Sequence, residues 1–249
     1  MNTLILDGKY QVQEVLTACE GFRACLCIDV ETDSGYRPVI VNTYTRDDDI
    51  RRLLPAFYDM RESGSPGLVR VVPGLHSVSA IFDCRRGTRL ASFFGRNCRS
   101  DFAERCHYAH QLLETCLLLD TVPDFIAHAC LSQENIMVLP ATRQMAMQWI
   151  LPPEEIREPG FRPRKMALLL SCLFEKNRFL PEAVPGFIGE LMTGECPSLA
   201  AALSKWKDLR NAVLEEHRRL LAEPWLRSVL RRLRQAAESA WISQRKRRG

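Results

Sequence analysis

The sequence predicts an α+β fold, with strands in the first third of the chain and helices in the remainder. Before residue 84, short runs of β-branched and apolar residues such as Val39-Ile40-Val41 are separated by turn residues. After residue 84, apolar residues recur at intervals of three and four, which is the spacing of an amphipathic helix. The 249 residues suffice for one large domain or two small ones.

The first 84 residues are expected to form five strands and one helix. Three aspartates from Asp47 open the helix, because carboxylates are favoured at the positive end of a helix dipole. The run Gly64-Ser65-Pro66-Gly67 ends it. The strands are expected at residues 10–16, 25–30, 39–44, 68–72 and 77–83.

The rest of the chain is predicted to be mainly helical. Short strands are expected near residues 136–138 and 145–147. Helices are expected at residues 102–119, 164–175, 187–194, 198–206, 206–222 and 224–244.

The composition is that of an ordinary globular protein, with 46% hydrophobic and 26% charged residues. No apolar run approaches the roughly 20 residues that span a bilayer, and the N-terminus lacks the pattern of a signal peptide. The ten cysteines are scattered without a C-x-x-C pair, mostly among apolar residues. They are expected to be small buried hydrophobes in a reducing cytosol, rather than disulfides or zinc ligands.

The charge is concentrated at the C-terminal end. Residues 225–249 hold eight basic residues and one acid, so this tail carries a net charge of +7. The whole chain carries +4, so the first 224 residues carry −3. The tail also has apolar residues at helical spacing. It reads either as a helix docked on the preceding domain with a solvated basic end, or as a segment for an anionic partner or membrane surface. The interaction residues proposed on this basis are Arg231, Arg232, Arg234, Arg245, Lys246, Arg247 and Arg248.

Nucleic-acid binding by this tail is not expected. Its basic residues are not interleaved with exposed aromatic residues, which single-stranded nucleic acids use for base stacking.

The stretch from His128 to Val138 carries a family resemblance. It resembles the catalytic loop of protein kinases, which runs H-R-D-L-x-x-x-N and precedes a short apolar strand. His128, Leu131 and Asn135 fall in register, while Ala129 and Cys130 replace the arginine and the catalytic aspartate. In kinases that aspartate accepts the proton of the substrate hydroxyl group.

The order of the predicted elements resembles the same family. Three strands, a helix and two strands match a small kinase lobe, residues 65–70 resemble its H-P-N-I-V turn, and Phe82 takes the gatekeeper position before a hinge. Only about a dozen residues separate Ile150 from the helix at 164, which implies a shortened activation segment. Over about residues 8–205, the resemblance implies a two-lobed protein-kinase-like fold with a small β-rich N-lobe, a helical C-lobe and extra C-terminal helices. It implies domain boundaries after residues 84 and 205, giving the segments 1–84 (N-lobe), 85–205 (C-lobe) and 206–249 (helical extension with the basic tail).

The resemblance also implies that the parts needed for phosphoryl transfer are missing. The counterpart of the glycine-rich loop retains only Gly21, and the metal-binding D-F-G aligns with residues 148–150. A neutral amide there attracts Mg²⁺ poorly, because this ion prefers anionic oxygen. The degenerate positions are Asn42 for the strand lysine, Ala56 for the helix glutamate, Cys130 for the catalytic aspartate and Gln148 for the D-F-G aspartate, with Asn135 the retained metal ligand.

The expected function is therefore that of a pseudokinase. Such a protein would act as an interaction scaffold or allosteric partner, without ATP or another cofactor, in the cytoplasm or at the cytosolic face of a membrane-associated assembly. The alternative is a divergent active kinase, or another nucleotide-dependent phosphoryl or nucleotidyl transferase with rearranged ligands. Binding of ATP with Mg²⁺ distinguishes the two hypotheses.

Several residues have both a chemical and a structural interpretation. Cys130 near His128 could form a nucleophilic pair, but a packed thiol is expected. Asn135 is expected to bind backbone groups rather than metal. His107 and His110 have the spacing of half a metal site, but packed or solvated histidines are expected.

Overall fold

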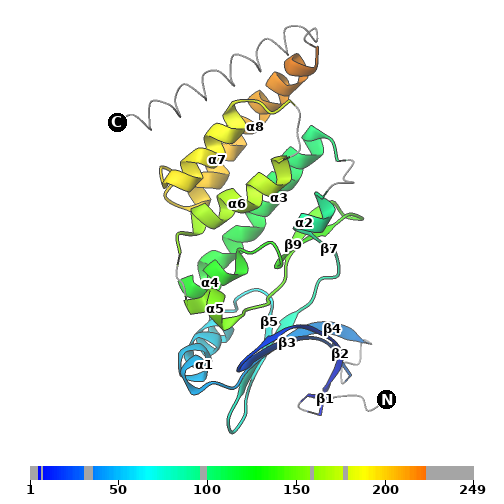
Figure 1. Ribbon diagram of the computed structural model, residues 1–249, viewed down its shortest axis with the longest axis vertical. Helices are drawn as coiled ribbons and strands as arrows, with labels where there is room; N and C mark the ends of the chain where they lie inside the picture. The colour runs from blue at the N-terminus through cyan, green and yellow to red at the C-terminus, as the bar shows by residue number, and fades with distance from the viewer. Residues whose placement is uncertain are drawn as a thin grey trace.

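The computed structural model shows an α+β protein with a β-rich N-terminal part and a helical C-terminal part (Figure 1). The structure describes residues 5–6, 8–30, 36–95, 100–157, 160–175 and 179–222. The N-terminal sheet has the strand order β1-β2-β3-β4-β6-β5, and its pairs are antiparallel. Its strands are Ile5–Leu6 (β1), Tyr10–Cys19 (β2), Phe22–Asp29 (β3), Arg37–Tyr44 (β4), Leu68–Pro73 (β5) and Val78–Asp83 (β6).

Helix α1 (Asp47–Glu62) links β4 to β5 and packs on β5 and β6. It begins at the run of aspartates, as the sequence predicts. The β2–β3 hairpin differs from the sequence-based prediction, which is a strand ending at residue 16 followed by a loop. Strand β2 instead continues to Cys19, and Gly21 makes the tight turn with a left-handed φ of 78°.

The helical part contains a small second sheet of order β7-β8-β9. Residues 84–87, without regular structure, lead into it from β6. Its strands are Thr88–Arg89 (β7), Ile136–Leu139 (β8) and Gln144–Met147 (β9). The helices are Leu90–Phe93 (α2), Phe102–Leu117 (α3), the 3-10 turn Leu118–Thr121 (η1), Asp124–Cys130 (α4), Pro153–Arg157 (α5), Arg162–Phe174 (α6), Ala183–Thr193 (α7) and Leu199–Ala222 (α8).

Two of the differences from the sequence-based expectation in the helical part have a clear physical reason. The catalytic-loop stretch was expected to be a loop, but His128 and Cys130 lie in the last turn of α4, where Ala127 and Ala129 favour a helix. Residues 198–206 and 206–222 were expected as separate helices. They form the single helix α8, which runs through Trp206 because no glycine or proline interrupts it.

One core cluster joins the two parts of the molecule. It contains Ile40 and Phe82 from the sheet, Phe57 from α1, and Leu112 and Leu170 from α3 and α6, all almost fully buried. A second, smaller cluster covers the other face of the sheet. Its buried members are Tyr10, Cys25, Cys27, Val39, Val41 and Ile81.

The alternation of side chains along β4 therefore divides the strand between two environments. Val39 and Val41 enter the smaller cluster, while Ile40 and Tyr44 enter the core shared with the helices. Asn42 lies between Ile40 and Tyr44 on the face of β4 that packs into the core shared with the helices. Among the residues that the structure describes, no helix is long and apolar enough to cross a membrane.

Candidate functional site

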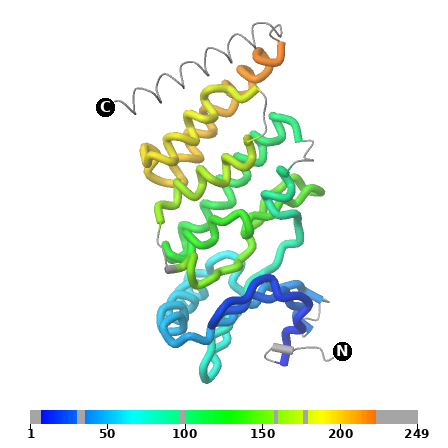
Figure 2. The backbone as a smooth tube through the Cα atoms, in the orientation of Figure 1, coloured from blue at the N-terminus to red at the C-terminus, as the bar shows by residue number. Residues whose placement is uncertain are grey.

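Asn42 connects the sheet to the segment that follows β9. Its Nδ2 donates to the carbonyl oxygen of Trp149 (2.6 Å), and its Oδ1 accepts from the backbone N–H of Leu151 (3.0 Å). The side chain is fully buried. An amide offers both a donor and an acceptor, so it pairs with these backbone groups as a neighbouring strand would. Figure 2 shows the segment between β9 and α5 passing along the boundary between the sheet and the helical part.

Asn135 binds the same segment from the helical side. Its Oδ1 accepts from the N–H of Ile150 (2.9 Å), and its Nδ2 donates to the carbonyl oxygens of Ile150 (2.9 Å) and Ala129 (3.2 Å). The side chain is 1% exposed. Its donor and acceptor groups are thus occupied by backbone, which is the structural role expected from the sequence.

Gln148 and Ala56 make weaker or purely apolar contacts. The Nε2 of Gln148 lies 3.4 Å from the carbonyl oxygen of Arg85, in the segment that links the two parts. Ala56 is buried in α1 and belongs to the shared core. Neither residue supplies a charge to the boundary.

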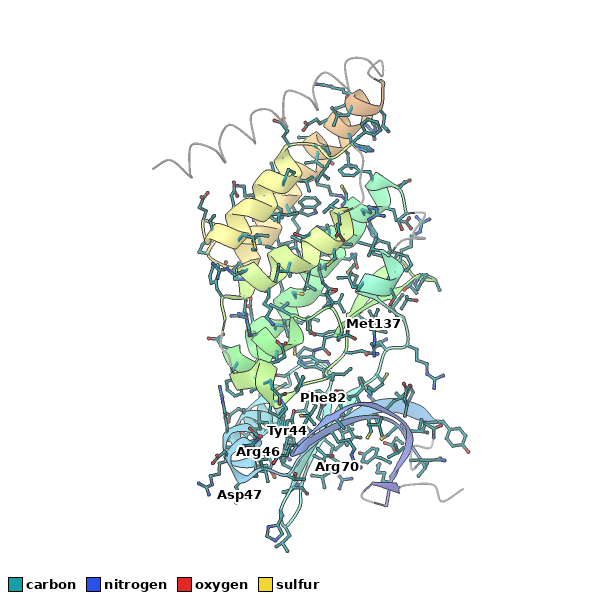
Figure 3. The ribbon with its side chains drawn as sticks, viewed as in Figure 1. Tyr44, Arg46, Asp47, Arg70, Phe82 and Met137 are labelled. Atoms are coloured by element: carbon teal, nitrogen blue, oxygen red, sulfur yellow. The ribbon has the colours of Figure 1, made fainter. Side chains whose placement is uncertain are left out.

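Trp149 fills the space between the sheet and the helices. Its ring stacks on Phe82, with centroids 5.2 Å apart and planes 7° apart, and it is 4% exposed. Gly67 allows this packing, because a Cβ atom there would overlap the indole Nε1. Figure 3 shows Phe82 and Tyr44 on the side of the sheet that faces the helical part.

Tyr44 and Asp49 belong to this region, although the sequence did not single them out as site residues. The hydroxyl of Tyr44 donates to the carbonyl oxygen of Leu151 (2.8 Å). Burial raises the pKa of Tyr44 well above its usual value, and nearby Cys130 and Asp49 add to this effect. The sequence predicts a helix-dipole role for the three aspartates at the start of α1, but Asp49 is buried. Its place in the first turn of an amphipathic helix is the only signal that the sequence offers.

Cys130 is fully buried in the last turn of α4. Burial raises the pKa of its thiol well above the usual value, and Cys116 contributes in the same direction. The thiol is therefore protonated at neutral pH, which makes it a poor nucleophile and a poor general base. His128 is also buried, and it packs directly against Gly160.

A cavity of about 350 Å³ lies between strand β2 of the sheet and the helical part, and Ile150 is one of its lining residues. Two ion pairs hold its charged residues: Arg89 with Glu134 (2.6 Å) and Lys165 with Glu155 (2.6 Å). Because each of these two cations is already paired with a carboxylate, neither attracts a polyphosphate strongly. Leu16, Thr17, Arg89, Ser132, Glu134, Ile150, Pro152 and Glu155 line it.

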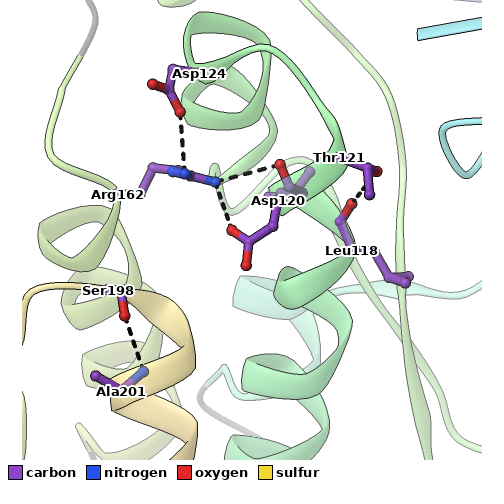
Figure 4. A network of polar contacts seen from close by, with 8 residues as sticks. Leu118, Asp120, Thr121, Asp124, Arg162, Ser198 and Ala201 are labelled. Atoms are coloured by element: carbon purple, nitrogen blue, oxygen red, sulfur yellow. Dashed lines mark hydrogen bonds and ion pairs between the residues drawn. The ribbon is translucent and has the colours of Figure 1, made fainter. Parts of the chain in front are cut away.

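A second cavity, of about 310 Å³, lies beside the ends of α6 and α8. Arg162 binds Asp120 (3.1 Å) and Asp124 (3.1 Å) there, so it joins α6 to η1 and α4 (Figure 4). Ser198 caps α8 by accepting from the N–H of Ala201 (3.1 Å). These contacts fix helix ends, and the guanidinium is already occupied by two carboxylates.

The described residues contain no group of three or more His, Cys, Asp or Glu that could hold a metal ion. His107 contacts the carbonyl oxygen of Arg143 (3.0 Å), and His110 contacts Glu114 (3.2 Å). Both are thus packed against polar groups of the protein. The interaction residues predicted in the tail, Arg231, Arg232, Arg234, Arg245, Lys246, Arg247 and Arg248, lie outside the described residues.

Comparison with known proteins gives no family assignment. No protein-family model matches the chain, and no curated protein matches it.

Proposed function

We propose that this chain is a protein-kinase-like protein without kinase activity, which acts as an interaction scaffold or allosteric partner. The order of elements supports this proposal. Three long antiparallel strands, a helix and two strands precede a helical part in the order that the sequence resemblance implies. The segment matched to D-F-G is bonded to the sheet through Asn42 and to the segment matched to the catalytic loop through Asn135.

The observation that carries the proposal is the bonding of Asn42. In active kinases a lysine on this strand pairs with the ATP phosphates and with a glutamate of the following helix. The matching residues here are Asn42 and Ala56. The amide of Asn42 binds the backbone of Trp149 and Leu151, so phosphates could reach it only by breaking two buried hydrogen bonds.

The matched metal positions support the same conclusion. Gln148 and Asn135 are neutral amides, and Asn135 already binds Ile150 and Ala129. Mg²⁺ needs oxygen ligands and prefers carboxylates. The stack of Trp149 on Phe82 also occupies space beside these residues.

Calorimetry and thermal unfolding with ATP and Mg²⁺ test the proposal. We expect no heat of binding and no change in melting temperature at millimolar ATP. The matched variant Gln148→Asp restores one carboxylate, and it should remain unable to bind, because parts that act together are not restored singly. A micromolar dissociation constant for the unmodified protein would contradict the proposal.

The second candidate is a divergent phosphoryl or nucleotidyl transferase. The cavity of about 350 Å³ favours it, because hydroxyl groups of Thr17 and Ser132 line it beside Glu134. An increase of several degrees in melting temperature with ATP and Mg²⁺ would support this candidate instead.

We further propose a protein partner, with contact to an anionic membrane surface through the basic tail at the cytosolic side. The support is the sequence alone, in which eight basic residues follow residue 224 and a single acid accompanies them.

A further inference from the structure

Helices α3 and α8 pack against each other in opposite directions. At one end, Phe102 of α3 stacks on His217 of α8, with ring centroids 4.0 Å apart. Further along, the positive charge of Arg210 in α8 lies close enough to lower the pKa of both Cys106 and His110 in α3. Residue numbers therefore rise along α3 as they fall along α8, and His110 lies at the level of Arg210.

This interface contains polar atoms that lack partners. Among the residues described, His110 Nδ1 and Arg210 Nε are buried there without a hydrogen bond. The two residues lie across from each other, on α3 and α8. A buried polar atom without a bond costs free energy, because it has lost its contact with water. The packing of α8 on α3 is therefore less stable than its apolar contacts alone would make it.

The charges around His110 are mostly positive. The titratable and charged groups that influence it are Glu114 and His107 on its own helix, and Lys207 and Arg210 on α8. Strand β9, helix α6 and the 3-10 turn η1 also pack on α3, and none of their residues is among the groups that shift the pKa of His110. Glu114 favours a proton on His110, since their side chains lie 3.2 Å apart, while the three other groups oppose it.

We propose that α8 is an acid-sensitive element, and that protonation of His110 opposite Arg210 weakens its packing on α3. The neutral imidazole fits the interface at neutral pH. A proton adds a further cation near Lys207 and Arg210, on a side chain that is only 16% exposed. Helix α8 and the chain attached to it then separate more readily from the helical part.

The direction of the pH effect follows from the pKa of His110. Burial is the largest influence and lowers this pKa from its usual value of 6.5. The packed state then binds a proton more weakly than the separated state. Packing is fully retained above the separated-state pKa of 6.5, and it weakens as the pH falls below that value.

Hydrogen exchange of the full chain at pH 7.5 and pH 5.5 tests the proposal, after correction for the intrinsic pH dependence of exchange. We expect amides of α8 to exchange several-fold faster at pH 5.5, while those of β4 and β6 change little. His110→Gln should remove the acceleration. His76→Gln, an exposed histidine between β5 and β6, should leave it intact. An α8 that is insensitive to pH, or a His110→Gln variant that keeps the acceleration, overturns the proposal.

Two further histidines lie along the same helix pair and need their own variants. His107→Gln and His217→Gln should both retain the acceleration of exchange in acid. If either variant loses it, the pH sensitivity of α8 belongs to that histidine and not to His110. Arg210→Met removes a cation that opposes protonation. NMR titration of the His110 ring should then give a higher pKa, closer to 6.5, and α8 should respond less to acid. This comparison remains valid if His110→Gln does not fold, and an unchanged pKa would contradict the proposal.

Discussion

Asn42, Asn135 and Tyr44 together bind the backbone of three consecutive residues. Asn42 and Tyr44 bond Trp149 and Leu151 from the sheet, while Asn135 bonds both backbone groups of Ile150 from the helical part. This buried segment has no regular secondary structure to satisfy its backbone. Side chains replace the missing ladder of hydrogen bonds, as buried backbone groups require.

Replacing either asparagine should destabilise the protein strongly. In Asn42→Leu and Asn135→Leu, an isosteric apolar side chain leaves at least two buried backbone groups unpaired, each costing about 1–3 kcal/mol. We expect the free energy of unfolding in urea to fall by about 2–6 kcal/mol for each variant.

Gln148→Leu is the matched control, because its contact with Arg85 is long, at 3.4 Å. It should lower the free energy of unfolding by less than about 1 kcal/mol. Equal decreases in the free energy of unfolding in all three variants would show that the hydrogen bonds of Asn42 and Asn135 to backbone stabilise the protein no more than the contact of Gln148 does.

The buried thiols predict a loss of stability in alkali. Burial raises the pKa of Cys27 and of Cys106 from 9.0 to about 12. Their stabilising effect is complete below pH 9, where the thiol is neutral in both states. Above pH 9 only the unfolded state ionises, so the free energy of unfolding should fall up to about pH 12, by roughly 1.4 kcal/mol per pH unit and thiol.

Urea unfolding between pH 8 and pH 10.5 checks this slope. Cys27→Ala and Cys106→Ala should each reduce it, although each also lowers stability at neutral pH by removing buried sulfur. Cys19→Ala alters an exposed thiol and serves as the control. An unchanged slope in both buried-site variants would refute this account.

At the scale of elements, helix α7 offers a clear gain in stability. Gly186 and Gly189 lie inside it, and a Cβ atom at either position would meet nothing within 4 Å. Glycine is less favourable than alanine in a helix interior by about 0.8–1.0 kcal/mol. Gly186→Ala and Gly189→Ala should therefore each raise the free energy of unfolding by about that amount.

Gly194 provides the opposite control for these substitutions. It ends α7 with a left-handed φ of 87°. Gly194→Ala should destabilise the protein by about 1–2 kcal/mol, because a Cβ atom strains this conformation. Thermal unfolding of the three variants measures both signs, and stabilisation by all three would refute the explanation.

Elements with a strong local pattern could be predicted from the sequence. The β-branched run of β4, the aspartates that open α1 and the apolar spacing of α3 each follow from interactions within a few residues. Helix α4 was missed, because resemblance to a loop outweighed the helix preference of Ala127 and Ala129. The continuity of α8 through Trp206 was missed in the same way, although no helix-breaking residue stands there.

The site could be predicted only in part. The sequence resemblance grouped Asn42, Asn135 and Gln148 as positions of one site and predicted backbone bonds for Asn135, but it did not indicate the partners of Asn42. Asn42 bonds a residue 107 positions further along the chain, and its partners are backbone atoms. Backbone atoms leave no mark in a sequence, so such contacts appear only in the folded chain.

At the scale of the whole molecule, the sheet lies at one end and the last turns of α8 at the other (Figure 1). The basic tail follows α8 and lies outside the described residues. We expect charge reversal at Arg245, Lys246, Arg247 and Arg248 to leave the melting temperature unchanged and to abolish binding to vesicles of anionic lipid. Each basic residue near such a surface contributes about 1 kcal/mol.

Truncation after Glu223 separates the two interpretations of the tail. If Leu226, Leu230 and Leu233 pack on the domain, their loss should lower stability by about 1.5–3 kcal/mol each. Vesicles of neutral lipid are the control for the binding measurement, and salt should weaken binding to anionic ones. Vesicle binding that ignores both salt and charge reversal would rule out the electrostatic role.

The bonds around residues 149–151 also bear on motion. Two parts joined only through residues 84–87 could rotate about that link as about a hinge. Here the segment after β9 is a second connection, held by Asn42 and Tyr44 on one side and by Asn135 on the other. Opening would break several buried hydrogen bonds and separate Trp149 from Phe82 at once. We therefore expect the sheet and the helical part to resist rotation about residues 84–87, so that a partner meets the boundary between them as a surface of fixed shape.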